Sequence, residues 1–178
     1  MLLRPEEKSS LPANNAKRLD ASGAVRELSR QILAKIGFNS FSVLRAPTGE
    51  PVWPDGVVGS LAHDDEMAVA VIGRSKDYLG LGIDVETAVP LPDDIISMVR
   101  TPEDICGQYD SSALADRILF CVKEAVYKAV YPLDRIILNY DDICVDLSKG
   151  IAYTAARKLN LNIFFDSKVT VIAALPQG

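Results

Sequence analysis

The sequence predicts an α+β fold made of two halves that meet near Tyr78. Helix-like and strand-like patterns follow one another in the order helix, strands, helix, strands. The C-terminal part reads as short strands separated by turns, which is typical of an antiparallel meander. A chain of 178 residues can form one sizeable domain or two small halves that share a core. We therefore expect halves at residues 1–76 and 77–178, each a small antiparallel sheet with a packed helix, joined in one compact unit.

The composition matches that of an ordinary soluble globular protein, with 48% apolar and 24% charged residues. The net charge of −5 argues against a nucleic-acid-binding protein, which usually carries a basic patch. Neither a signal peptide nor an apolar run long enough to span a membrane is found, so we expect a cytoplasmic monomer. The three widely spaced cysteines fit reduced thiols better than a disulfide or zinc site.

The first half opens with a polar segment at residues 1–15, which we expect to be loose. Residues 16–36 then show helical periodicity, and Gly37 ends the helix. Arg26 and Arg30 are four residues apart and share a face of this helix. They form either a solvated basic stripe or a source of positive charge for a ligand.

After a loop punctuated by proline and glycine, two short strands flank a turn that contains His63, the single histidine of the chain. The second half begins with a strand over 79–86. A loop follows, and Thr101 with Pro102 then predicts the start of a helix. The clearest helix runs over 112–131, capped by Ser111 or Ser112, and four short strands complete the chain.

The strand over 79–86 carries two carboxylates on one face. Its apolar residues alternate with the others, which is the period-2 pattern of a half-buried strand. Asp84 and Glu86 therefore point the same way, about 6–7 Å apart at about 3.3 Å of rise per residue. Two such charges repel one another unless a cation or cationic side chains lie between them.

The helix over 112–131 has an apolar stripe and a second face that bears charges. The stripe consists of Val122, Ala125, Val126, Ala129 and Val130. Glu124 and Lys128 are neighbours on the other face, and by themselves they read as a surface ion pair. If the helix crosses the strand, Glu124 completes a three-carboxylate site, and Mg²⁺ prefers such oxygen ligands together with substrate phosphates. His63, Lys123, Lys128 and the Arg26/Arg30 pair would supply positive charge for a polyphosphate.

Three segments in this order, "WPDGVVGSLAH", "GLGIDVE" and "FCVKEAVYKAVYP", resemble the motifs of the 4′-phosphopantetheinyl transferases, specifically the enterobactin/surfactin-type branch. The resemblance implies a pseudo-dimeric fold with the ligand cleft between its halves. It also implies the reaction: the phosphopantetheine arm of coenzyme A moves to a serine of an apo acyl or peptidyl carrier protein, with Mg²⁺. Adenosine 3′,5′-bisphosphate is released, and the pathway is one of secondary metabolism, as in enterobactin biosynthesis.

The resemblance also implies roles for individual residues. Asp84, Glu86 and Glu124 would hold Mg²⁺, and Glu124 could accept the serine proton. Lys128 would contact the α-phosphate as the second catalytic residue. The implied coenzyme A-binding residues are Arg26, Arg45, Ser60, His63, Asp84, Lys123 and Lys128.

Several positions depart from the family pattern. Ala62 stands where the family has a hydroxyl residue before the histidine, Glu50 where a basic residue is often found, and Val25 where glycine often precedes the arginine. This leaves two alternatives open. One is a catalytically weakened paralogue that binds coenzyme A, and the other is a Mg²⁺-dependent phosphohydrolase that acts on a small phosphate ester.

Overall fold

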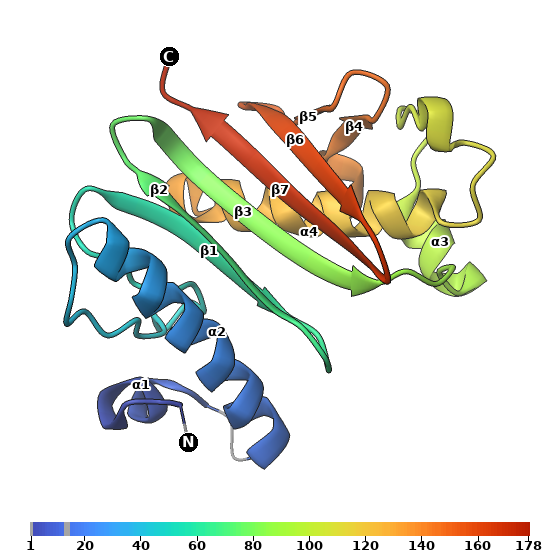
Figure 1. Ribbon diagram of the computed structural model, residues 1–178. Coiled ribbons are helices and arrows are strands. Elements are labelled where there is room, and N and C mark those ends of the chain that lie inside the picture. Colours follow the sequence, from blue (N-terminus) through green and yellow to red (C-terminus); the bar gives the residue numbers. More distant parts are fainter. Residues whose placement is uncertain (1, 13–14) are drawn as a thin grey trace.

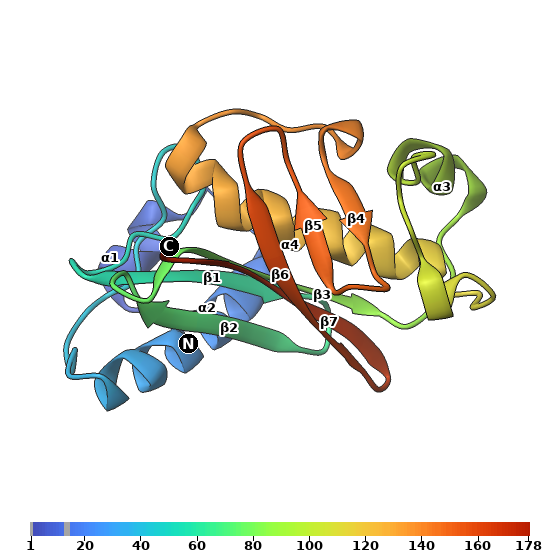
Figure 2. The same cartoon turned by 90° about the horizontal axis from the view of Figure 1, so that it is seen from above.

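The computed structural model describes residues 2–12 and 15–178, and it confirms the α+β class (Figure 1). Two antiparallel sheets, one of two strands and one of five, each carry a long helix (Figure 2). The first sheet pairs β1 (Val57–His63) with β2 (Ala68–Arg74), and α2 (Ala16–Lys35) packs on it. The second has the order β3-β7-β6-β5-β4 and is covered by α4 (Ala115–Asp134).

The strands of the second sheet are β3 (Tyr78–Thr87), β4 (Cys144–Asp146), β5 (Ile151–Tyr153), β6 (Lys158–Phe165) and β7 (Lys168–Pro176). The last four form the meander that the sequence predicts, and β3 joins them by pairing with β7. The β2–β3 turn connects the two sheets. The proposed division of the chain at residue 76 falls in this turn and stays a prediction.

Helix α4 lies directly against the backbone of β3. A Cβ added at Gly82 would lie 1.8 Å from the Ala125 carbonyl oxygen, and one at Gly80 would lie 2.3 Å from that of Ala129. Only glycine permits this approach. The close contact therefore fixes the helix along the polar face of the strand.

The opposite face of β3 packs on the first sheet. Ile83 and Val85 form a buried cluster with Ala62 of β1. Strand β3 is thus the layer between α4 and the two-stranded sheet, and side chains from both halves approach one another along it. The apolar stripe of α4 is buried as the sequence predicts, since each of its five residues is at most 1% exposed.

Three sequence-based expectations about elements are wrong. The lead-in contains a helix, α1 (Pro5–Ser10), because Glu7 is fully buried and bound to the distant Arg30. The expected helix at Thr101 is absent, since the Asp104 carboxylate accepts the Thr101 N–H in a turn. Helix α3 (Asp93–Val99) forms instead in the expected loop, after Pro92 and with two acidic residues in its first turn, which the helix dipole favours.

Two short 3₁₀ helices, Gly107–Tyr109 and Tyr140–Asp142, lie before and after α4. Helix α4 itself starts at Ala115 rather than at residue 112, because the Ser112 hydroxyl accepts the Leu114 N–H in the preceding turn. Within residues 2–12 and 15–178, no helix combines the length and apolar character needed to cross a bilayer.

Candidate active site between β3 and α4

Asp84 lies at the centre of the site, where β3 meets α4. Its side chain is largely buried, and its Oδ1 accepts a 2.6 Å hydrogen bond from the Lys128 ammonium. Lys128 also donates to the Ile83 carbonyl oxygen at 3.3 Å. The second carboxylate oxygen, Oδ2, is buried and has no hydrogen-bond partner among the described residues. A buried carboxylate oxygen without a partner costs free energy, so this position favours a cation.

Glu86 lies beside Asp84 on the same face of β3, as the alternation predicts. Burial raises the pKa of Glu86, and the neighbouring Asp84 raises it further, whereas Arg117 and Lys128 act in the opposite direction. The Arg117 guanidinium donates to Glu86 at 2.8 Å. The raised pKa means that these cations do not fully compensate the pair of carboxylates.

Glu124 comes from α4, one residue before the Ala125 carbonyl that touches Gly82. The Tyr140 hydroxyl donates a 2.8 Å hydrogen bond to its Oε1, and burial together with this bond raises the pKa of Tyr140. The Tyr140 hydroxyl therefore holds Glu124 of α4. On β3, Lys128 holds Asp84 and Arg117 holds Glu86.

Across the part of the chain that the structure describes, no three His, Cys, Asp or Glu side chains lie close enough together to hold a metal ion, so Asp84, Glu86 and Glu124 do not form the expected three-carboxylate cluster. The donors nevertheless fit a hard dication. Asp84 and Glu86 offer oxygen ligands, one of which lacks any partner, and Mg²⁺ commonly uses one or two carboxylates plus phosphate oxygens.

Lys123 is placed differently from its neighbour Lys128. Its ammonium is fully buried and donates to the Val99 carbonyl (2.8 Å), the Asp104 carboxylate (2.7 Å) and the Tyr140 carbonyl (2.9 Å). An ammonium has three N–H donors, so all are used. This placement does not support Lys123 as a phosphate ligand. Its role is structural, because it joins α4 to Val99, Asp104 and Tyr140.

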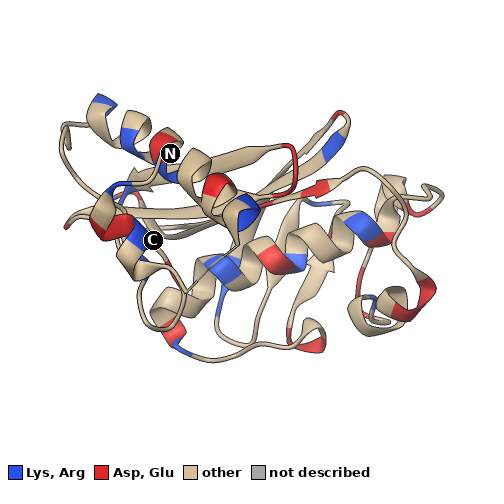
Figure 3. Ribbon diagram, turned by 90° about the horizontal axis from the view of Figure 1, so that it is seen from below, with Lys and Arg blue, Asp and Glu red and all other residues tan. Residues whose placement is uncertain are grey.

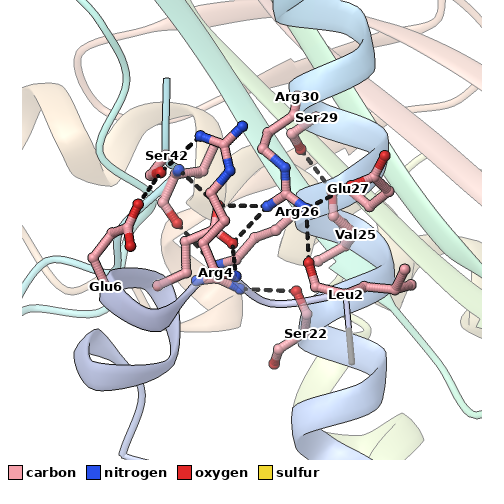
Figure 4. Close-up of polar contacts among 12 residues, drawn as sticks. Leu2, Arg4, Glu6, Ser22, Val25, Arg26, Glu27, Ser29, Arg30 and Ser42 are labelled. Atoms are coloured by element: carbon pink, nitrogen blue, oxygen red, sulfur yellow. Dashed lines mark hydrogen bonds and ion pairs between the residues drawn. The ribbon is translucent and has the colours of Figure 1, made fainter. Parts of the chain in front are cut away.

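Arg26 and Arg30 of α2 are also bound within the protein (Figure 4). Arg30 contacts Glu7 at 2.5 Å and Glu27 at 2.5 Å. Arg26 is buried and donates to the carbonyl oxygens of Val43 (2.8 Å) and Ser22 (3.2 Å). The structure therefore separates the pair: Arg30 forms ion pairs with carboxylates, whereas Arg26 donates its hydrogen bonds to carbonyl oxygens and feels the Glu7 carboxylate only through space.

A cleft of about 610 Å³ lies between α2 and the β1–β2 turn, and both basic and acidic side chains line it. The basic ones are Lys17, Arg18 and His63, and the acidic ones are Asp20, Asp64, Asp65 and Glu66. Lys17 pairs with Asp65 at 2.8 Å. Partial burial lowers the pKa of His63, and the positive charges of Lys128 and Arg26 lower it further. Basic residues gather along α2, whereas acidic and basic residues alternate on α4 (Figure 3). Lys17 and Arg18 line this cleft although they are not among the residues that the sequence predicts for the site; the adjacent basic pair at the start of α2 is the signal that could have pointed to them.

A second cleft, of about 530 Å³, lies between the two halves of the molecule. The 48–53 loop and β1 form one wall, and β3 and α4 form the other. Ser60 and Lys128 line it with the aromatic rings of Trp53, Tyr127 and Tyr131. Arg45 lies just before this loop, and its backbone forms an isolated antiparallel β-bridge with Pro51. Burial lowers the pKa of Arg26, and the positive charge of Arg45 also acts to lower it. Of the predicted binding residues, Ser60 and Lys128 line this cleft and His63 lines the first one, whereas neither lining includes Arg26, Arg45, Asp84 or Lys123.

Two family models match the chain, one in each half. A family model described as the 4′-phosphopantetheinyl transferase N-terminal domain matches residues 6–73, and one described as the 4′-phosphopantetheinyl transferase superfamily matches residues 80–173. The chain is 37% identical to 4′-phosphopantetheinyl transferase Svp of Streptomyces mobaraensis over 156 residues, which is 84% of this chain and 63% of Svp.

Two further relatives show the same relationship. 4′-Phosphopantetheinyl transferase Npt of Nocardia iowensis is 34% identical over 164 residues, covering 85% of this chain and 73% of Npt. Enterobactin synthase component D of Salmonella typhi is 34% identical over 131 residues, covering 69% of this chain and 48% of that protein. The chain thus spans 48–73% of the length of these relatives. Because the superfamily model alone covers more than half of the residues, this chain belongs to the 4′-phosphopantetheinyl transferase superfamily.

Proposed function

We propose that this protein transfers the 4′-phosphopantetheine arm of coenzyme A to a serine of an apo carrier protein, in a Mg²⁺-dependent reaction that releases adenosine 3′,5′-bisphosphate. The observation that carries this proposal is the contact of α4 with Gly80 and Gly82, which brings Lys128 onto Asp84. Membership of the superfamily supports the same reaction. A cytoplasmic monomer that serves acyl or peptidyl carriers remains part of the proposal.

Asp84, Glu86 and Glu124 would hold the magnesium ion. When bound, Mg²⁺ neutralises the charge that develops on the pyrophosphate as the phosphopantetheine arm departs. Two observations support this role: Asp84 Oδ2 has no hydrogen-bond partner among the described residues, and burial together with the neighbouring Asp84 raises the pKa of Glu86. Arg117 holds one oxygen of Glu86 in position by its 2.8 Å hydrogen bond.

The other residues bind and orient the substrates. Lys128 lies beside Asp84, where its ammonium can contact a phosphate of the pyrophosphate. Glu124 is proposed to accept the serine proton, and the Tyr140 hydroxyl fixes one of its two carboxylate oxygens. His63 with Arg18 would bind the 3′-phosphate in the cleft beside α2, where Lys17 is paired with Asp65. Arg26 and Arg45 would contribute positive charge at the nucleotide end.

The cleft between the halves suits the uncharged pantetheine arm. Trp53, Tyr127 and Tyr131 give it apolar walls, and Ser60 adds a hydroxyl. Its volume of about 530 Å³ lies in the range usual for small-molecule sites, which are mostly apolar with a few polar groups. The arm would run from the magnesium site along this cleft.

The decisive experiment incubates the protein with coenzyme A, Mg²⁺ and a panel of apo carrier proteins from fatty-acid, polyketide and peptide synthesis. Mass spectrometry should detect carriers heavier by one phosphopantetheine group, together with adenosine 3′,5′-bisphosphate. No mass change on any carrier would count against the proposal.

Ala62 gives a second candidate some support, because it removes a hydroxyl next to His63 and is buried against Ile83 and Val85. A coenzyme A-binding protein without transferase activity would show Mg²⁺-dependent binding of coenzyme A by calorimetry and no carrier modification. The phosphohydrolase alternative would release inorganic phosphate instead of the nucleotide bisphosphate.

A further inference from the structure

Lys168 connects the two sheets at the edge of the site. It is the first residue of β7 and is only 6% exposed. Its ammonium lies 2.6 Å from the Asp64 carboxylate and 2.7 Å from that of Glu66, and it donates to the Thr87 hydroxyl at 3.2 Å. The two acids belong to the β1–β2 turn, whereas Thr87 ends β3. One buried cation therefore joins the tip of the first sheet to the end of the second.

The turn held by Lys168 follows His63 directly. Asp64 shapes the turn, because its Oδ1 accepts the backbone N–H groups of Glu66 (2.8 Å) and Met67 (2.7 Å). Its other oxygen, Oδ2, faces Lys168. The same carboxylate thus sets the conformation of the turn beside His63 and ties it to the second sheet.

The contact between Lys168 and Asp64 influences the distance between two proposed binding regions. His63 lies on the first sheet, and Asp84 and Glu86 lie on the second, close to Thr87. Coenzyme A carries its 3′-phosphate and its pyrophosphate on the same ribose, so the covalent structure limits their separation. A buried ion pair adds little net stability, because the ammonium gives up hydration, and its main consequence here is geometric.

We propose that Lys168 is a positioning residue that sets the distance between the His63 region, which binds the 3′-phosphate, and the Asp84–Glu86 pair, which binds the pyrophosphate through Mg²⁺. This inference rests on the proposed transferase function. The ammonium acts through Asp64 and the turn, and it does not itself contact the substrate.

The test compares coenzyme A with dephospho-coenzyme A, which lacks the 3′-phosphate. Transfer to an apo carrier is measured by mass spectrometry for wild type, Lys168→Met, Asp64→Asn and His63→Ala. The Asp64→Asn change keeps the Oδ1 acceptor that shapes the turn and removes the charge that faces Lys168. The matched control is Lys149→Met, which removes an exposed lysine paired with Asp146 on the same half.

For Lys168→Met we expect kcat/KM with coenzyme A to fall about tenfold, the loss typical of a weakened hydrogen bond to a charged group. The value with dephospho-coenzyme A should stay within about twofold, because that substrate does not use the His63 region. Asp64→Asn should give the same pattern, and the Lys168→Met/His63→Ala double variant should lose no more than His63→Ala alone. Lys149→Met should change neither substrate.

A second readout does not depend on transfer. Calorimetry without Mg²⁺ should show weaker binding of adenosine 3′,5′-bisphosphate to Lys168→Met and unchanged binding of adenosine 5′-monophosphate. Equal losses for both substrates would identify a general structural defect and overturn the proposal, as would an unchanged preference for coenzyme A. A wild-type protein that modifies no carrier would instead contradict the proposed function, which separates the two failures.

Discussion

Two clusters of charged side chains in this molecule contain the same kinds of residue but differ in how completely their hydrogen bonds are made. Around α1 and α2, the fully buried Glu7 accepts hydrogen bonds from Arg30 and from the backbone N–H groups of Arg4 and Val43. Between β3 and α4, Asp84 has one oxygen on Lys128 and the other without a partner among the described residues. The first cluster is internally satisfied, and the second leaves one carboxylate oxygen without a hydrogen-bond partner among the described residues.

The difference shows how a structural cluster can be told from a binding site. A buried charge whose hydrogen bonds are all made inside the chain holds elements together, because removing one partner leaves another unpaired. A buried carboxylate that retains a free oxygen beside a second acid of raised pKa has a place for a ligand. The following predictions test this distinction, from the largest expected effect to the smallest.

Replacing Asp84, the acid with an unpartnered oxygen among the described residues, should abolish transfer without unfolding the protein. For Asp84→Asn we expect transfer to fall by at least about 10³-fold, because the metal would lose a charged oxygen ligand. Mass spectrometry of the carrier measures the rate, and thermal unfolding checks the fold. Asp134→Asn, which weakens a pair with Arg157 at the end of α4, is the control and should stay active. Retained activity in Asp84→Asn would remove this residue from the metal site.

Replacing Glu7, whose carboxylate is fully hydrogen-bonded within the chain, should lower the stability of the fold. We expect Glu7→Gln to lower the free energy of unfolding by about 3 kcal/mol, the lower end of the cost of breaking a buried ion pair, because Arg30 would keep only Glu27 as a charged partner. Denaturant titration measures this change. Glu27→Gln is the matched control, because Glu27 also pairs with Arg30 but its side chain is 38% exposed, and it should change stability little. Equal effects of the two variants would contradict a buried structural role for Glu7.

The same distinction applies to two lysines on one helix. Lys123→Met should lower the free energy of unfolding by about 3–5 kcal/mol, since Asp104 would stay buried without its cation. Lys128→Met should lower transfer by about 10²-fold with a smaller change in Tm, because its side chain is 30% exposed. Tm and the transfer rate, measured on both variants, separate the two roles. A large loss of stability in Lys128→Met with unchanged kcat would reverse the assignment.

The smallest effect concerns Glu86 in the metal-free protein. Its raised pKa means that the folded state binds the proton more tightly than the unfolded state, so its contribution to stability is lost as the pH rises through the folded pKa. We therefore expect Glu86→Gln to raise Tm slightly at neutral pH, with the difference disappearing well below pH 4.5, the ordinary pKa of a glutamate. Calorimetric scans across this range provide the check. A lower Tm at neutral pH would show that the Arg117 pair outweighs burial.

Local patterns predicted the parts of the site that depend on short-range geometry. The alternation around Asp84 and Glu86 places both acids on one face of β3, and the spacing in α4 places Lys128 opposite its apolar stripe. The α+β class follows from the order of these patterns. The helix expected at Thr101 failed, because a side-chain contact from Asp104 competes there with the helix signal.

Contacts between distant segments could not be predicted in the same way. Lys123 and Lys128 lie on the same helix, and the sequence does not distinguish their roles. In the structure, three acceptors from α3, the following loop and Tyr140 surround the Lys123 ammonium. Helix α1 is too short to show periodicity, and Glu7 holds it through a residue 23 positions away. The tie between Lys168 and Asp64 likewise spans the two sheets.

By itself the sequence determined which chemical groups this protein has and which face of each element carries them, because side-chain direction follows from the backbone period. The tertiary structure alone decided which charges are neutralised within the chain and which stay available. That depends on which elements pack together, here α4 on the glycines of β3 and α1 on α2, since burial and partners determine the state of a charged group.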